Sequence, residues 1–199
     1  MHDPIAARTI GTYLETLASS APTPGGGSVA GVIGALGCSL GKMVIVLTGC
    51  DSEDNAAAIR TVDQMLSELQ VHFTELAEKD EAAYQGYRDA AAMPRSSAEK
   101  KSQRRAQMQI ALKYAASVPL ETARSALTLA ELLVPVQKLG NPHLHSDTRI
   151  ALLCGTACFE ASRINVDVNL ALIRDEEFVS EMTTQVQELT DRLQVTINS

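Results

Sequence analysis

The most regular hydrophobic pattern in the chain runs from residue 59 to residue 87. Apolar side chains recur there at alternating intervals of three and four residues, and no proline occurs between Ser52 and Pro94. Such spacing places these side chains on one face of a single long helix that packs lengthwise against its neighbours. The face comprises Ile59, Val62, Leu66, Leu69, Phe73, Leu76, Asp80, Ala83 and Tyr87, and one of its members is therefore a carboxylate.

Residues 25–48 form a second apolar stretch, in which Lys42 is the one charged residue. Its length would allow it to cross a bilayer, because about 20 apolar residues suffice. However, it is rich in Gly, Ala, Ser and Val, and the other candidate helices are too amphipathic to accompany it into lipid. Glycines four residues apart share a helix face and let another helix approach closely. We therefore predict a buried central helix with tight packing, within the chain or across a dimer.

The remaining periodic stretches predict further helices, and no stretch has the alternation of a strand pair. Prolines and short polar residues give the helix ends, because proline removes a backbone donor and a polar side chain can bind the free amides of a first turn. A capping box of Ser96 and Glu99 opens a helix that we expect to stop at Val118, before Pro119. The other expected helices cover residues 3–20, 120–138 and 147–173, the last capped by Ser146, and a final segment with an apolar face at Val179, Met182, Val186, Leu189 and Leu193.

Composition agrees with this helical pattern. The 199 residues suit one domain, and 45% hydrophobic with 21% charged residues is ordinary globular usage. Aromatic residues make up 4%, with no Trp, while Ala and Leu are abundant, and this mixture favours helices over sheets. The sequence therefore predicts an all-α fold, a single domain over residues 1–199 built as a bundle of long helices.

The charge of the chain and its lack of a signal-peptide pattern limit which binding partners and which cellular compartment we expect. A net charge of −7 disfavours phosphate backbones and anionic membranes, whose binding requires clustered Lys and Arg. Residues 1–4 lack the basic start of a signal peptide. The four cysteines, Cys38, Cys50, Cys154 and Cys158, form no Cys-x-x-Cys pair and are expected as free thiols. We expect a cytoplasmic protein with no nucleic-acid partner and no membrane partner.

Asp80 is the first candidate for chemistry, because a carboxylate on an apolar helix face is costly to desolvate unless it is paired or its pKa is raised. A pKa raised toward neutrality suits a general base or a general acid. Two structural alternatives stay open at this point. Either the carboxylate binds a neighbouring arginine, or drift of the helical pattern turns position 80 toward solvent.

Two further segments have groups that could contact a ligand. Residues 21–28, with the sequence Ala-Pro-Thr-Pro-Gly-Gly-Gly-Ser, place free backbone amides at a helix start, where a carboxylate or carbonyl oxygen can bind. A tight helix start without a ligand is the alternative. Asn165 and Asn169 lie four residues apart on one helix face, as two amides that can hold a flat polar heterocycle or simply satisfy neighbouring backbone.

Three residues after the loop at residue 140 resemble metal ligands. His143, His145 and Asp147 are close in sequence, but neither a His-Glu-x-x-His motif nor a second cluster completes a site. We therefore predict no metal site and expect polar loop residues instead. The basic run Lys100–Arg105 is expected to be a solvated helix face, which could meet an anionic substrate tail.

Taken together, these residues resemble the cyclodeaminase domain of formiminotransferase-cyclodeaminase and the related free-standing bacterial methenyltetrahydrofolate cyclohydrolases. The resemblance spans nearly the whole chain. Its most distinctive motif is the proline-glycine segment at residues 21–28, and the later motifs follow in the same order. These are Lys42-Met-Val44, Asp80-Glu-Ala-Ala-Tyr84, Ser117-Val-Pro-Leu120, Gly140-Asn141, Ser146-Asp147 and Asn165-Val-Asp-Val-Asn169.

This resemblance implies an all-helical homodimer with a folate-binding cleft near the dimer interface. The substrate would be a tetrahydrofolate derivative, and neither a metal nor another cofactor is expected. The resemblance assigns catalysis to Asp80. It assigns substrate binding to Gly25, Gly26, Gly27, Ser28, Asp147, Asn165 and Asn169.

The function expected first is that of a methenyltetrahydrofolate cyclohydrolase, which hydrolyses 5,10-methenyltetrahydrofolate to 10-formyltetrahydrofolate, because the 199 residues contain no transferase domain. Asp80 would take a proton from the attacking water and return it to the departing nitrogen. One alternative is a formiminotetrahydrofolate cyclodeaminase, which releases ammonia. Another is a helical dimer that binds folate or a protein partner without catalysis.

Overall fold

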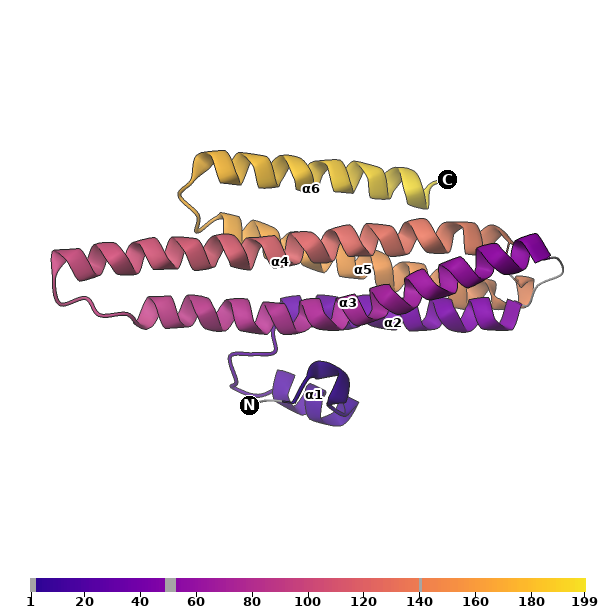
Figure 1. Ribbon diagram of the computed structural model, residues 1–199, viewed down its shortest axis with the longest axis horizontal. Coiled ribbons are helices and arrows are strands. Elements are labelled where there is room, and N and C mark those ends of the chain that lie inside the picture. The colour runs from indigo at the N-terminus through magenta and orange to yellow at the C-terminus, as the bar shows by residue number, and fades with distance from the viewer. Residues whose placement is uncertain (1–2, 49–52, 140) are drawn as a thin grey trace.

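The computed structural model describes residues 3–48, 53–139 and 141–199, and all regular structure in these residues is helical. Figure 1 shows an elongated bundle whose long helices run along the molecule. The predicted all-α class is therefore confirmed. The elements are η1 (Ile5–Ala7), α1 (Ile10–Leu17), α2 (Gly26–Thr48), α3 (Glu53–Ala92), α4 (Ala98–Leu139), η2 (Pro142–Leu144), α5 (His145–Leu170) and α6 (Glu176–Ile197).

The body of the bundle consists of α2, α3, α4 and α5, which pack against one another. α6 packs on the outer side of α4, and η1 contacts α3. In Figure 1 the N-terminal segment and α6 lie on opposite sides of the bundle. One apolar core cluster connects α2 through α6, and a smaller one, formed by Ile5, Tyr13 and Ala77, fixes the N-terminal segment to α3.

The apolar face predicted for residues 59–87 is the core-facing side of α3. Leu66, Phe73 and Leu76 are 0%, 0% and 1% exposed, and the other apolar members of the face are buried or packed against the same core. The apolar face of α6 is also buried, as the sequence predicts. Both helices are therefore held by one continuous stripe of side chains rather than by intrinsic propensity.

α2 lies against α3, α4 and α5 along a side formed largely by glycines. A Cβ on Gly31 would lie 2.7 Å from the carbonyl oxygen of Phe73, so α3 approaches more closely than a larger residue would allow. Among the described residues α2 is the one helix long and apolar enough to span a membrane, and half of its apolar window is buried in the bundle. The opposite side of this helix is exposed and apolar, with Leu36, Met43, Val46 and Leu47.

The predicted helix end at Val118 is wrong, because α4 continues through Pro119 to Leu139 as one helix. Proline has no backbone N–H, so Pro119 leaves the carbonyl of Ala115 without its usual helical donor. Nδ2 of Asn169 on α5 donates to this carbonyl over 2.9 Å. The hydrogen bond lost inside α4 is thus replaced by a side chain that is distant in sequence.

Three helix starts also differ from the prediction. Ser97 rather than Ser96 caps α4, with its Oγ accepting from the N–H three residues on over 3.2 Å. Residues 3–20 contain two short helices instead of one, because Thr9 is extended and caps α1. Ser146 lies inside α5, whose first turn has no side-chain cap. In each case a neighbouring residue of the same chemistry, or a local backbone turn, sets the helix start.

The described cysteines are free, as expected from the sequence, and Cys50 lies outside the described residues. Burial raises the pKa of the thiols of Cys38 and Cys158 to about 12. Both thiols therefore stay protonated near neutral pH and act as small core side chains.

Candidate active site

A cleft of about 350 Å³ opens where the start of α2 meets α3, α4 and the C-terminal part of α5. Six predicted site residues line it, and they come from three segments that are far apart in sequence. These six are Gly25, Gly26, Gly27, Asp80, Asn165 and Asn169. The other lining residues are Pro22, Thr23, Tyr84, Tyr87, Leu112, Val168 and Leu172.

The carboxylate of Asp80 lies in the wall of this cleft, on the face of α3 that the sequence marked. Its Oδ2 accepts a hydrogen bond from the backbone N–H of Ser28 over 3.1 Å. Burial raises the pKa of Asp80, the Ser28 hydrogen bond lowers it, and the neighbouring Glu81 carboxylate raises it, with a net increase. A carboxyl group with a raised pKa next to a cleft is suited to take and return a proton.

Neither structural alternative for Asp80 describes this geometry. The nearby Arg8 pairs with Glu81, and no ion pair to Asp80 occurs in the described part of the chain. Nor does position 80 turn to bulk solvent, because its carboxylate is largely buried against the start of α2. The buried charge is compensated by a backbone amide rather than by a cation.

The glycine-rich segment brings the start of α2 up to this carboxylate. Ser28 is fully buried, and its N–H is one of the amides that have no partner within a first helical turn. The partial positive charge of a helix start favours an anion at this position. Gly27 has no side chain, and this allows the Asp80 carboxylate to reach the amide.

The two asparagines use their amide nitrogens to bind backbone carbonyls. Nδ2 of Asn165 donates to Ala161 over 2.8 Å, and Nδ2 of Asn169 donates to Ala115 and to Asn165 over 2.9 Å each. The nitrogens thus satisfy backbone, as one of the two interpretations predicts, and both residues line the cleft. The amide oxygens remain the groups that can accept hydrogen bonds from a ligand.

Asp147 does not line this cleft. It lies in the first turn of α5, 18 residues before Asn165, which corresponds to about 27 Å along a helix. His143 and His145 are exposed. Among the described residues no three His, Cys, Asp or Glu side chains gather in a group that could hold a metal ion.

Several cleft residues were not predicted as site residues. Tyr84 and Tyr87 lie four and seven positions after Asp80, so the helical period that marked Asp80 also places them on its face. Val168 was marked only as part of the motif at residues 165–169. Leu112 and Leu172 carried no comparable signal, because α4 and the turn after α5 bring them to the cleft only in the folded chain. These side chains make part of the wall apolar.

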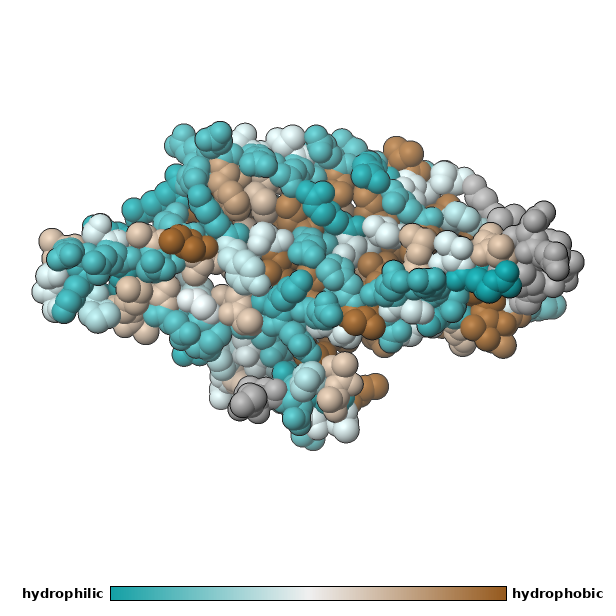
Figure 2. Space-filling view, in the orientation of Figure 1, coloured by the Kyte–Doolittle hydropathy of each residue, from teal (hydrophilic) through white to brown (hydrophobic). Residues whose placement is uncertain are grey.

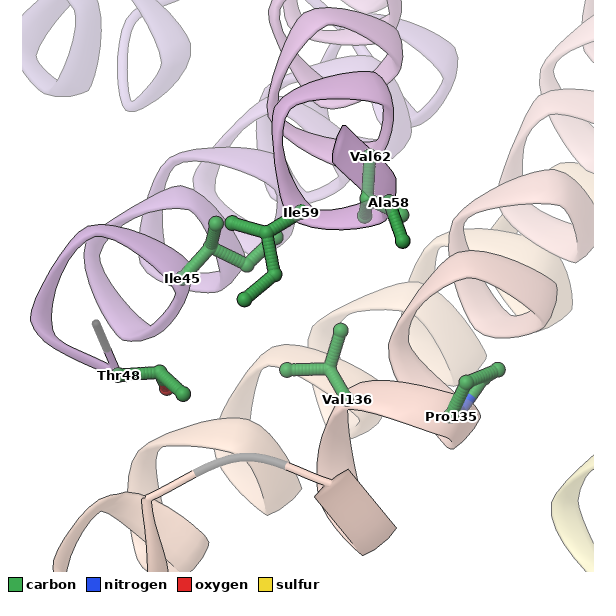
Figure 3. Close-up of a pocket in the computed structure, with 7 residues that line it drawn as sticks. All are labelled: Ile45, Thr48, Ala58, Ile59, Val62, Pro135 and Val136. Carbon is green, nitrogen blue, oxygen red and sulfur yellow. The ribbon is translucent and has the colours of Figure 1, made fainter. Parts of the chain in front are cut away.

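A second cavity of about 150 Å³ lies among α2, α3 and α4. Figure 3 shows its lining, which is almost entirely aliphatic and contains no titratable side chain: Ile45, Thr48, Ala58, Ile59, Val62, Pro135 and Val136. It offers no group for acid–base chemistry. A wider hollow of about 500 Å³ between α3 and α4 contains one carboxyl group, that of Asp89, which is exposed. The cleft with the largely buried carboxylate of Asp80 is therefore the candidate active site.

Fold and cleft together define an all-α protein whose candidate active site is built around one largely buried carboxylate. Residues 9–188 match the family model described as formiminotransferase-cyclodeaminase. This match covers most of the sequence, and the chain belongs to the formiminotransferase-cyclodeaminase family.

Individual relatives agree with this assignment. The chain is 34% identical to the methenyltetrahydrofolate cyclohydrolase of Methylorubrum extorquens, over 91% of this chain and 88% of that protein. It is 28% identical to the formimidoyltransferase-cyclodeaminase of Gallus gallus over 94% of its own length, which is 35% of the chicken protein. The crystal structure of formiminotetrahydrofolate cyclodeaminase from Thermotoga maritima superposes with a TM-score of 0.87 at 30% identity, over 96% of this chain and 93% of that one.

Proposed function

We propose that this protein is a folate one-carbon enzyme that hydrolyses 5,10-methenyltetrahydrofolate to 10-formyltetrahydrofolate. The observation that carries the proposal is the partly buried Asp80 carboxylate in the wall of the cleft, held by the Ser28 amide. The relative from Methylorubrum extorquens, which is named a methenyltetrahydrofolate cyclohydrolase and is matched over 88% of its length, supports this choice of reaction.

In this reaction water adds to the electrophilic carbon between nitrogens five and ten of the folate. Asp80 takes a proton from that water and delivers it to nitrogen five as the bond from this nitrogen to the carbon breaks. The hydroxyl proton of the adduct is released as the formyl carbonyl forms, so one proton leaves overall. A carboxylate also stabilises the cationic substrate electrostatically, and the chemistry requires only substrate, water and a proton carrier.

A cyclodeaminase activity is the second candidate, because the superposed Thermotoga maritima structure is named a formiminotetrahydrofolate cyclodeaminase. There nitrogen ten attacks the formimino carbon and ammonia leaves, and the same carboxylate can carry the protons. Purified protein separates the two activities. Loss of methenyltetrahydrofolate absorbance above the uncatalysed rate supports hydrolysis, whereas ammonia release from formiminotetrahydrofolate supports deamination. Folate binding without either turnover would instead indicate a non-catalytic folate-binding protein, and absence of folate binding and turnover would refute both enzymatic functions.

The functional unit that we propose is a homodimer formed through α2 and α5. These adjacent helices each expose an apolar stripe, which costs free energy in water. A second copy suits such a surface, because a two-fold axis brings the same patch against itself. Figure 2 shows that the face formed by α3, α4 and α6 is in contrast largely hydrophilic. The stripes consist of Leu36, Met43, Val46 and Leu47 on α2, and Ile150, Leu153, Ile164 and Val168 on α5.

Such a dimer would also give Asp147 a place in the site. A two-fold axis near the middle of α5 exchanges the two ends of this helix, so Asp147 of one copy would approach the cleft end of α5 in the other copy. Mixing two inactive variants, Asp80→Asn and Asp147→Ala, tests this arrangement. About a quarter of the wild-type activity should return, because half of the dimers are then mixed and each holds one intact site. No recovery after proven subunit exchange would show that Asp147 does not contribute to the site of the other copy.

A cytoplasmic location, and the lack of nucleic-acid, membrane and cofactor partners, remain predictions from the sequence. The dimer proposal is independent of them.

A further inference from the structure

A second carboxylate lies directly behind the candidate base. Glu81 follows Asp80 in α3, and its side chain is 15% exposed. The guanidinium of Arg8, itself 10% exposed, donates two parallel hydrogen bonds of 3.2 Å to the two oxygens of Glu81. Arginine and carboxylate thus form a bidentate pair with little solvent screening, a geometry stronger than that of exposed pairs.

This ion pair is connected to the candidate base through one residue, Ser28. The backbone N–H of Ser28 donates to Asp80, while its Oγ donates to Oε1 of Glu81 over 3.4 Å and contacts the hydroxyl of Tyr13 at 3.0 Å. Ser28 therefore binds both carboxylates at once. The amide that holds Asp80 and the hydroxyl that contacts Glu81 thus belong to the same residue.

Few charged groups lie near Asp80. Glu81 is the nearest anion, Arg8 is its counter-ion, and Tyr13 adds a phenol whose pKa burial raises above the ordinary value. Tyr84 and Tyr87 lie on the same helix face. The lining residues from α2, α4 and α5 are uncharged glycines, asparagines and aliphatic side chains.

We propose that Arg8 and Glu81 are positioning residues of the active site, which act through Ser28 to hold the Asp80 carboxylate and to balance the charge beside it. This inference rests on the proposed function for its role in catalysis. It gives the N-terminal segment a task in the reaction, because Arg8 precedes α1 and is 73 residues away from Glu81. Neither residue touches the cleft, so neither is assigned contact with substrate.

The two partners of the ion pair should have opposite effects, which a purely structural ion pair would not produce. Arg8→Met leaves the Glu81 charge uncompensated next to Asp80, so the acidic limb of the pH–rate profile should move up by about one pH unit. Glu81→Gln removes the anion and keeps an acceptor for Ser28, so the limb should move down. The double variant Arg8→Met/Glu81→Gln should return it close to the wild-type position. Glu131→Gln, which breaks an exposed ion pair between α4 and α6, is the matched control and should leave it unchanged.

A second readout does not require turnover. The carboxyl ¹³C resonance of Asp80 is assigned by its disappearance in Asp80→Asn. Its pH titration should give a higher apparent pKa in Arg8→Met and a lower one in Glu81→Gln than in the wild type. Shifts in the same direction, or none, in folded variants would overturn the positioning role even if the wild-type protein is active. Opposite shifts in a protein without folate turnover would support the positioning role and refute the proposed function.

Discussion

Gly27 at the start of α2 faces Asp80 of α3 so closely that a Cβ on residue 27 would overlap the Asp80 carboxylate. The preceding Gly26 differs, because a Cβ there would lie 3.5 Å from the amide atoms of Asn165, an ordinary contact distance. The close approach at residue 27 is what allows the next N–H, that of Ser28, to bind Asp80. Residue 27 must therefore be a glycine for the Asp80 carboxylate to keep its position, whereas residue 26 has room for a Cβ.

Gly27→Ala should abolish turnover, because the added methyl group displaces the Asp80 carboxylate from the Ser28 amide. Gly86→Ala, on α3 outside the Asp80 cleft and with nothing within 4 Å of an added Cβ, should keep wild-type activity and is the matched control. Steady-state rates with methenyltetrahydrofolate, together with circular dichroism to verify folding, make the comparison. Equal activity of the two variants would show that turnover does not require the observed position of the Asp80 carboxylate.

Asp80→Asn should lower kcat by about 10²- to 10⁴-fold, the usual contribution of a positioned general base. The amide oxygen can still accept from Ser28, so the geometry is kept while the proton acceptor is lost. Asp89→Asn, nine residues further along α3, is the control and should have wild-type kcat. A folded Asp80→Asn variant with unchanged kcat would exclude Asp80 as the base.

The raised pKa of Asp80 also predicts how stability changes with pH. In the window between its unfolded and folded pKa values, the folded state binds more protons, so the free energy of unfolding falls as pH rises. Asp80→Asn has no such titration. Relative to this variant, the wild type should therefore lose stability from about pH 4 upward. Urea unfolding of both proteins at several pH values measures the difference, and a constant difference would contradict the raised pKa.

Removal of the Asn169 amide should destabilise the fold. Asn169→Ala leaves the Ala115 carbonyl without a donor, which costs about 1–3 kcal/mol when the group is buried. Pro119→Ala restores a backbone N–H at the position that normally donates to this carbonyl. In the double variant the loss should therefore be smaller than in Asn169→Ala alone. Additive free energies of urea unfolding across the four proteins would show that the two sites are not coupled.

Leu153→Glu should dissociate the proposed dimer, because it introduces a charge into the exposed apolar stripe of α5, where Leu153 is 67% exposed. Val195→Glu on α6, at a side chain 72% exposed, is a control of equal charge and similar exposure. Sedimentation velocity on both variants gives the mass of each species. A wild-type protein that sediments as a monomer would reject this interface directly.

The sequence was most informative where one periodic pattern coincided with one buried face. The apolar face of residues 59–87 predicted the long helix α3, its core side and the unusual carboxylate at position 80. Packing of one helix face against the core imposes the three- and four-residue spacing of its apolar side chains. It was least informative at prolines. Pro119 predicts a helix end from local chemistry alone, whereas the structure supplies the missing hydrogen bond from Asn169.

The residues of the candidate site could be named in advance, but their grouping could not. Periodicity and motif resemblance marked Asp80, the glycine segment and the asparagines, since each is unusual for its local setting. That the C-terminal part of α5 meets the cleft, away from Asp147, and that Glu81 and Arg8 lie behind Asp80, follows only from how the helices pack. The sequence by itself determined the helices, their buried faces and the candidate base, because these depend on local spacing and on the cost of burying a charge. The tertiary structure decided which amide, ion pair and side chains surround that base, because contacts between segments 50 to 80 residues apart are set by packing alone.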